Sequence, residues 1–121
     1  MEKEENVEIN TIPRLFWDSV KSRGERVAMR EKDLGIWQEI SWSHYGEKAK
    51  LTGLALHTLG LEKGNVVSIA SEGNPEWLYT DMGTIGAGGI SSGVYTTDSA
   101  AQVKYLVNDS ATKFYFAENE E

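Results

Sequence analysis

Residues 65–95 constrain the fold more than any other part of the chain. They read NVVSIASEGNPEWLYTDMGTIGAGGISSGVY. The apolar run Val66–Ala70 is followed by a helix-start signal at Asn74, a helix rich in small residues and a second apolar run, Ile90–Val94. This order predicts a strand, a crossover helix and a second, parallel strand. No charged residue follows Asp81 within the unit, so we expect much of it to be buried on both faces.

The sequence on either side of this unit predicts further helices and strands. Thr11 is a helix cap, with Pro13 in the first turn, and Gly24 fits the end of that helix. A β-hairpin and a helix follow, and a helix and a last strand close the chain. The expected fold class is therefore α/β, with an N-terminal helix and β-hairpin before an open, mostly parallel, layered α/β sheet. The predicted ranges are hairpin strands at 26–30 and 36–42 joined by 31–35, a helix from Ser41 or Ser43 to Gly60, a helix at 75–86, a helix capped by Thr97 or Asp98, and a last strand at 113–117.

The charge balance is acidic, with a formal net charge of −7 over 121 residues. That balance argues against nucleic acid and anionic membrane surfaces as direct partners. The chain has no cysteine, which excludes disulfides, a thiolate nucleophile and cysteine-bound metal. No apolar segment follows the first charged residues, and no apolar run reaches about 18 residues. We therefore expect no signal peptide, no transmembrane segment and a cytoplasmic location.

Two short motifs resemble catalytic signatures but lack their context. Gly89–Gly93 matches G-x-S-x-G, which places a nucleophilic serine between a strand and a helix and needs a later histidine. Here Ser91 falls inside a predicted strand, and the only histidines, His44 and His57, come earlier and lack partners at metal-ligand spacing. The glycines within 83–89 end a helix and lead into a strand, the reverse of a phosphate-binding loop. Close helix–sheet contact is the favoured interpretation of these glycines.

Four tryptophans offer large apolar surfaces that could line a ligand site. A small core also needs large side chains, and packing is the favoured interpretation. They are Trp17, Trp37, Trp42 and Trp77. The residues taken alone thus describe a soluble α/β domain with no self-contained active site.

Several segments, taken in order, carry a resemblance to a known family. They are VAMR at 27–30, GIWQEISW at 35–42, NPEWL at 74–78, GAGG at 86–89 and VY at 94–95. This ordered set resembles the opening of long-chain fatty acyl-CoA synthetases, which are AMP-forming adenylating enzymes. The resemblance runs from about Thr11 to Ala117. It implies that residues 11–121 are the incomplete N-terminal portion of the large domain of an adenylating enzyme, after a polar lead-in at 1–10.

The resemblance implies a parent reaction in which ATP and a fatty acid give an acyl-adenylate and pyrophosphate, after which the acyl group passes to CoA. ATP, Mg²⁺ and CoA are expected for the intact enzyme. The family's phosphate loop, magnesium motif and catalytic lysine match nothing here, so we expect this chain alone to bind no cofactor and to be inactive.

Two hypotheses follow about what the chain is. In the first, it is a structural N-terminal fragment of a long-chain fatty acid–CoA ligase, whose partners are the rest of the synthetase chain, the fatty acid and CoA. The intact enzyme could then lie peripherally at membranes. The alternative is a standalone, non-catalytic α/β binding module derived from such an enzyme. A fragment would leave its last strand at 113–117 without the neighbours that come later in the full domain, which predicts self-association.

Candidate ligand contacts are expected beyond the carboxyl ends of the strands, where sites form in such sheets. That rule favours the loops at 71–74 and 95–97. In the resembling enzymes the second loop faces the acyl and CoA channel, so Tyr95, Thr96 and Thr97 are predicted to line a substrate channel. Other roles stay open, with Asn74 as a helix cap and Tyr95 as a packing residue. Relatives often have proline where Thr96 stands, so this loop lacks one source of rigidity.

Overall fold

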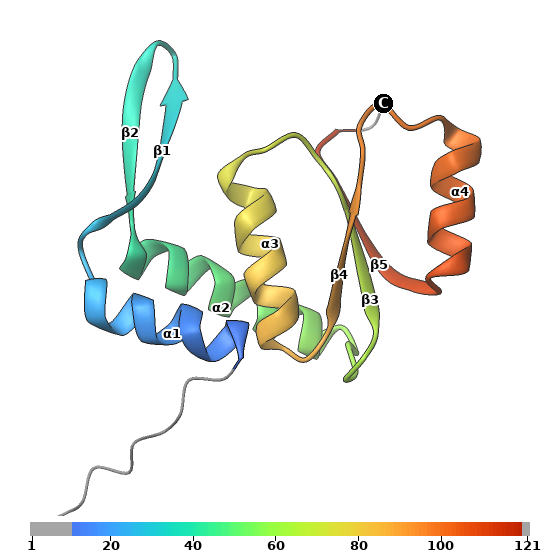
Figure 1. Cartoon of the computed structure of the whole chain (residues 1–121), viewed down its shortest axis with the longest axis horizontal. Helices are drawn as coiled ribbons and strands as arrows, with labels where there is room; N and C mark the ends of the chain where they lie inside the picture. Colours follow the sequence, from blue (N-terminus) through green and yellow to red (C-terminus); the bar gives the residue numbers. More distant parts are fainter. Residues whose placement is uncertain (1–10, 120–121) are drawn as a thin grey trace, which may run out of the picture.

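The structure, a computed structural model, describes residues 11–119 (Figure 1). The predicted lead-in at 1–10 lies outside the described residues. Helices and strands follow in the order α1 (Ile12–Arg23), β1 (Val27–Asp33), β2 (Ile36–Ser41), α2 (Trp42–Thr58), β3 (Val66–Ala70), α3 (Pro75–Gly86), β4 (Ile90–Val94), α4 (Ala100–Asp109) and β5 (Thr112–Ala117). Across 11–119, no helix has the length and apolar character needed to cross a membrane.

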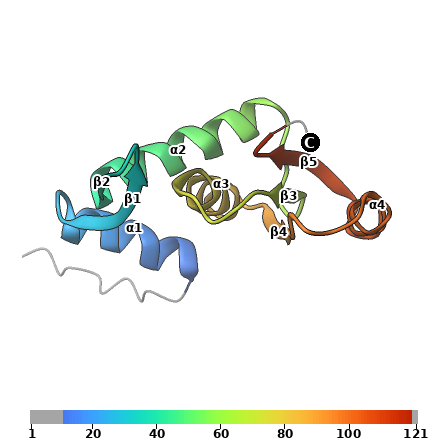
Figure 2. The ribbon, with the colours of Figure 1, turned by 90° about the horizontal axis from the view of Figure 1, so that it is seen from above.

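The elements are arranged in successive layers. Figure 2 shows α1 and the hairpin at one end, α3 in the middle, then the sheet, with α4 on the far side of the sheet from α3. Strands β1 and β2 pair antiparallel, and β4, β3 and β5 form a parallel sheet in that order. The predicted fold class is confirmed, with β3 in the centre of the sheet because the two later strands pair on either side of it.

Burial in the sheet is concentrated on its central strand. Val67, Ser68 and Ile69 are at most 1% exposed. In β4, by contrast, only Val94 is buried, and Ile90 is 52% exposed. The expectation that much of the unit is buried on both faces therefore holds for β3 but is wrong for β4, which is an edge strand of the sheet.

The core consists of two apolar clusters that join the helices to the sheet. One is built on Phe16, Tyr45 and Ala49, where α1 meets α2. The second is built on Leu56, Leu61 and Val67, where α2 meets β3. The first cluster also takes in Val20, Ala28, Met29, Trp42, Tyr79 and Met82, and the second Ala87 and Phe114.

Packing is not the role of every tryptophan. Trp42 packs against the first core cluster, and the Trp17 ring makes an edge contact with Phe16 at a centroid distance of 5.1 Å. Trp37, however, is 63% exposed. The expectation that the four tryptophans pack in a core is wrong for Trp37, because the hairpin that carries it projects from the body of the molecule (Figure 1).

The hairpin is longer and its turn tighter than the sequence predicted. Strand β1 continues to Asp33, which pairs with Ile36. Only Leu34 and Gly35 form the turn, with φ of 48° and 78°. Positive φ at both positions is typical of the two-residue type I′ turn, whose twist matches that of the strands. The predicted five-residue connection is therefore wrong, because its first three residues extend the ladder.

Helix caps follow the sequence signals except at α4. Thr11 caps α1, as predicted. Ser41, one of the two predicted options, caps α2, and Asn74 caps α3 in the helix-cap role that the sequence left open for it. The cap of α4 is Ser99, neither Thr97 nor Asp98. The reason is a capping box. The Gln102 side chain accepts from the Ser99 backbone N–H at 2.8 Å, and Ser99 Oγ accepts from the Gln102 N–H at 3.3 Å.

Two glycines allow α2 and α3 to approach closely. A Cβ at Gly83 would lie 2.7 Å from the Ala49 carbonyl oxygen and 2.8 Å from the Thr52 Cβ. A Cβ at Gly53 would lie 2.9 Å from the Gly83 carbonyl oxygen. The close contact at Gly83 is thus between two helices. The predicted close contact between helix and sheet occurs at Gly89, directly before β4, where a Cβ would lie 2.9 Å from the Thr84 side chain.

Candidate functional site

The carboxyl ends of the three parallel strands lie at one edge of the sheet, at the top of Figure 1. Residues 71–74 connect β3 to α3, and residues 95–99 connect β4 to α4. Glu118 follows β5 at the same edge, where its backbone N–H donates to the Ala70 carbonyl at 3.1 Å. The structure therefore brings together the two loops that the sequence selected and adds a third segment.

The Glu118 carboxylate links this third segment to the loop after β3. It accepts hydrogen bonds from the Glu72 N–H at 2.9 Å, from Ser71 Oγ at 3.5 Å and from Asn74 Nδ2 at 3.4 Å. Glu72 in turn accepts from the Thr96 hydroxyl at 2.7 Å. We call Ser71, Glu72, Asn74, Thr96 and Glu118 the edge network. It connects the ends of all three strands.

Glu118 is the member of the edge network that the sequence analysis missed. Its partners lie 44 to 47 positions earlier in the chain, and only the pairing of β5 with β3 brings them close. The available signal was its place directly after the last predicted strand, where the rule for carboxyl ends applies to a third strand as well.

The predicted channel residues differ in their surroundings. Tyr95 is 78% exposed, so the alternative role of a packing residue is wrong for it within this chain. Tyr95 and Thr96 border an open groove of about 930 Å³ between the strand ends and α4. Thr97 is exposed and does not border that groove. The assignment of these residues to a substrate channel remains a prediction.

The groove is acidic at its mouth. Glu72, Asp98 and Glu118 border it, and Lys104 is the one basic side chain among its lining residues. Phosphate groups prefer helix N-termini and clustered cations; the groove borders the first turn of α4 at Ala100 but has a single basic side chain in its lining. No group of three metal-ligating side chains exists among residues 11–119. Whether this chain alone binds ATP or Mg²⁺ therefore stays a prediction.

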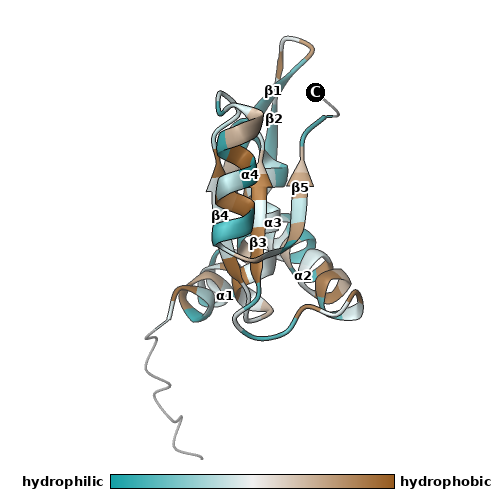
Figure 3. Ribbon diagram, turned by 90° about the vertical axis from the view of Figure 1, so that its right-hand side faces the viewer, coloured by the Kyte–Doolittle hydropathy of each residue, from teal (hydrophilic) through white to brown (hydrophobic). Residues whose placement is uncertain are grey.

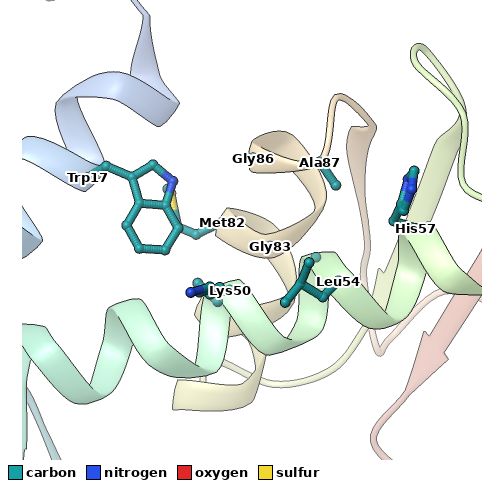
Figure 4. A pocket seen from close by; sticks show the side chains of 10 residues that line it. Trp17, Lys50, Leu54, His57, Met82, Gly83, Gly86 and Ala87 are labelled. Carbon is teal, nitrogen blue, oxygen red and sulfur yellow. The ribbon is translucent and has the colours of Figure 1, made fainter.

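A second concavity lies between α1, α2 and α3, with a volume of about 250 Å³ (Figure 4). Trp17 borders it from α1, Lys50 and Leu54 from α2, and Met82 and Gly86 from α3. Room exists there because a Cβ at Gly86 would meet only Trp17 Nε1, at 3.8 Å. Ligand pockets usually exceed about 300 Å³, so this cleft is smaller than a typical small-molecule site.

Tyr45 and Tyr79, two tyrosines with raised pKa values, belong to the first core cluster. Burial, together with the smaller effects of the nearby Asp81 and Tyr79, raises the pKa of Tyr45 to about 12. Burial, followed by Glu76 and Glu31, also raises the pKa of Tyr79. Both phenols stay protonated near neutral pH, so neither is suited to proton abstraction.

The nucleophile elbow is excluded by the structure. Ser91 lies within β4, and its hydroxyl donates to the Asp81 carbonyl at 3.4 Å. No strand-to-helix turn carries it, and both histidines lie on α2, with His44 exposed near Tyr79. Ser91 therefore lies outside the strand-to-helix turn on which a nucleophile elbow depends.

Comparison with known proteins identifies the family. The model of the AMP-binding enzyme family matches residues 16–121. The chain belongs to this family. Among curated proteins, the long-chain-fatty-acid–CoA ligase ACSBG2 of Xenopus laevis is 33% identical over 110 residues, 91% of this chain and 15% of that protein. ACSBG1 of Homo sapiens, also a long-chain-fatty-acid–CoA ligase, is 33% identical over 99 residues, 82% of this chain and 14% of that protein. The chain thus spans about 15% of the length of the first of these relatives.

Solved structures of adenylating enzymes share the fold. The N-terminal subdomain of NpsA from Klebsiella oxytoca superposes with a TM-score of 0.82 at 16% identity, covering 93% of this chain and 29% of that one. The anthranilate CoA ligase AuaEII, in complex with anthranoyl-AMP, gives 0.78 at 20% identity, covering 85% of this chain and 19% of that one. At these identities the likeness establishes the fold alone.

Proposed function

We propose that the chain forms the N-terminal portion, over residues 11–121, of the large domain of a long-chain fatty acid–CoA ligase. The observation that carries the proposal is the match to curated ligases, which covers 91% of this chain but 15% of the relative. A scaffold role fits that match. Two apolar clusters hold the sheet and the helices together, as a structural segment requires.

In this proposal the parent enzyme joins a fatty acid to CoA through an acyl-adenylate, with ATP, Mg²⁺ and CoA held by later parts of a longer chain. This segment positions loops at the strand ends. The hydrogen bond from Thr96 to Glu72 orders the loop after β4, and Tyr95, Thr96 and Thr97 line the acyl and CoA channel. The proposed location is the cytoplasm, with peripheral contact at membranes.

One observation favours the alternative of a standalone, non-catalytic module. The edge network satisfies the polar groups at the strand ends from within the described residues, through Glu118 and Glu72. Hydrogen bonds among the described residues therefore link the ends of the three strands at this edge. Such a module would present the groove beside α4 to a ligand of its own.

Sequencing the native transcript past codon 121 distinguishes the ligase proposal from the standalone module. The ligase proposal expects the frame to continue into a loop rich in Thr, Ser and Gly that ends in Lys-Gly. A stop codon directly after Glu121 would contradict it and favour the module. With oleate as substrate, the purified 121-residue chain should show no exchange of pyrophosphate into ATP.

A further inference from the structure

The β1–β2 hairpin ends in three exposed apolar side chains. Leu34 is 94% exposed, Ile36 64% and Trp37 63%. We call these three residues the hairpin tip. In Figure 1 the hairpin rises from α1 and α2, and its turn stands clear of the other elements. An apolar group this exposed on a projecting element marks an interaction surface.

The hairpin tip is apolar on both faces and at its apex. Ile36 lies opposite Asp33 and Trp37 opposite Lys32. Because neighbouring residues of a strand point to opposite faces, Ile36 and Trp37 cover the two faces while Leu34 occupies the apex. A protein surface would contact one face of a hairpin. A hairpin tip with apolar side chains on both faces is better suited to an apolar environment that surrounds it on all sides.

Local backbone preference does not explain a leucine at the apex. Leu34 has a φ of 48°, in the left-handed region. The first position of a type I′ turn favours Asn, Asp or Gly, and a bulky residue there is strained. The chain therefore keeps a large apolar side chain at the point of greatest exposure in spite of its conformational cost.

We propose that the hairpin tip inserts into the interface of a zwitterionic lipid bilayer. Trp37 is of the residue type that concentrates at the membrane interface, and the Lys32 ammonium lies 5.9 Å from its ring, placed to reach the headgroups. The hairpin carries no excess of positive charge, since Arg30 and Lys32 are outnumbered by Glu31, Asp33 and Glu39. With a net charge of −7, the chain as a whole disfavours an anionic surface.

The size of the hairpin tip argues against a protein partner or a second copy of the chain. A large side chain contributes about 200 Å² at most, and stable interfaces bury about 800 Å² per partner. Three partly exposed side chains fall short of that area. Insertion into a bilayer has no such threshold, because lipid surrounds each apolar group that enters it.

The hairpin tip points to the same side of the molecule as the carboxyl ends of the sheet, at the top of Figures 1 and 3. A bilayer bound by the tip would therefore lie on the side of the Tyr95–Thr97 loop. Delivery of a membrane-derived fatty acid to that loop rests on the proposed function. Lipid binding itself does not, and it can be tested separately.

The test is sedimentation of the 121-residue chain with vesicles of dioleoylphosphatidylcholine. We expect the chain to bind, and Leu34→Asn with Ile36→Thr to lower the partition coefficient at least tenfold. The variant keeps its fold, since Asn is favoured at the strained position and Thr in a strand. Leu59→Asn is the control. Leu59 is 69% exposed and lies at the far end of the 17-residue α2, about 25 Å from the start of that helix, so binding should stay unchanged.

Three results would overturn the proposal. They are failure of the natural chain to bind these vesicles, equal binding by the double variant with unchanged circular dichroism, and equal loss in Leu59→Asn. Stronger binding to phosphatidylserine vesicles would contradict the charge argument. Loss of a dimer in the double variant, seen by analytical ultracentrifugation, would assign the tip to a protein contact.

Discussion

The Thr84 hydroxyl is buried and has no hydrogen-bond partner among the described residues. A buried polar group without a partner costs free energy that an apolar group of the same shape does not. Thr84→Val should therefore raise the free energy of unfolding by about 1 kcal/mol, measured by urea denaturation.

A matched control lies one turn earlier on α3. Thr80 is also buried, but its hydroxyl donates to the Glu76 carbonyl at 2.8 Å. Thr80→Val should lower the free energy of unfolding by about 1 kcal/mol. If both variants were destabilised alike, the Thr84 hydroxyl would have a hydrogen-bond partner in solution, and the claim that it is buried without one would be wrong.

At the scale of elements, the contact between α2 and α3 depends on Gly83. Gly83→Ala should destabilise the chain by about 1–3 kcal/mol, because its Cβ would overlap the Ala49 carbonyl. Gly86→Ala, one turn later on α3, has open space and should stabilise by up to about 1 kcal/mol through helix propensity. Thermal unfolding of the pair checks this. Equal effects would show that helix propensity, and not the close contact, governs both positions.

The sequence predicted helices and strands well where the signals that bound an element lie within or next to that element. The strand Val66–Ala70 and the helix Pro75–Gly86 match the prediction residue for residue, because apolar runs and the cap at Asn74 bound them. The hairpin turn was missed because cross-strand pairing extends β1. The cap at Ser99 was missed because the Gln102 partner decides among three adjacent candidates.

The candidate site was predictable only in outline. The rule for parallel sheets selected both loops at the strand ends, and the structure joins them through Thr96 and Glu72. The Glu118 contacts depend on the pairing of strands more than 40 positions apart, which no local pattern encodes.

At the scale of the whole molecule, β4 and β5 are the edge strands of the parallel sheet within residues 11–119. Tyr115 is 44% exposed on β5 and Ile90 is 52% exposed on β4. Open edges with apolar side chains favour strand pairing between copies. We expect the 121-residue chain to associate with rising concentration in sedimentation velocity, and Tyr115→Lys to reduce that association. A natural chain that stays monomeric at about 100 μM would contradict this expectation.

The central claim is that this chain is the N-terminal portion of a long-chain fatty acid–CoA ligase. It is tested most directly by transplanting residues 11–119 into ACSBG2 of Xenopus laevis in place of the matching segment and measuring oleoyl-CoA formation. The same ligase with the segment deleted is the control, and thermal unfolding verifies that the chimera is folded. The account predicts oleoyl-CoA formation within about tenfold of the parent enzyme, a loss of about 1.4 kcal/mol in transition-state stabilisation. A chimera that unfolds at the parent's temperature but makes no oleoyl-CoA would contradict it.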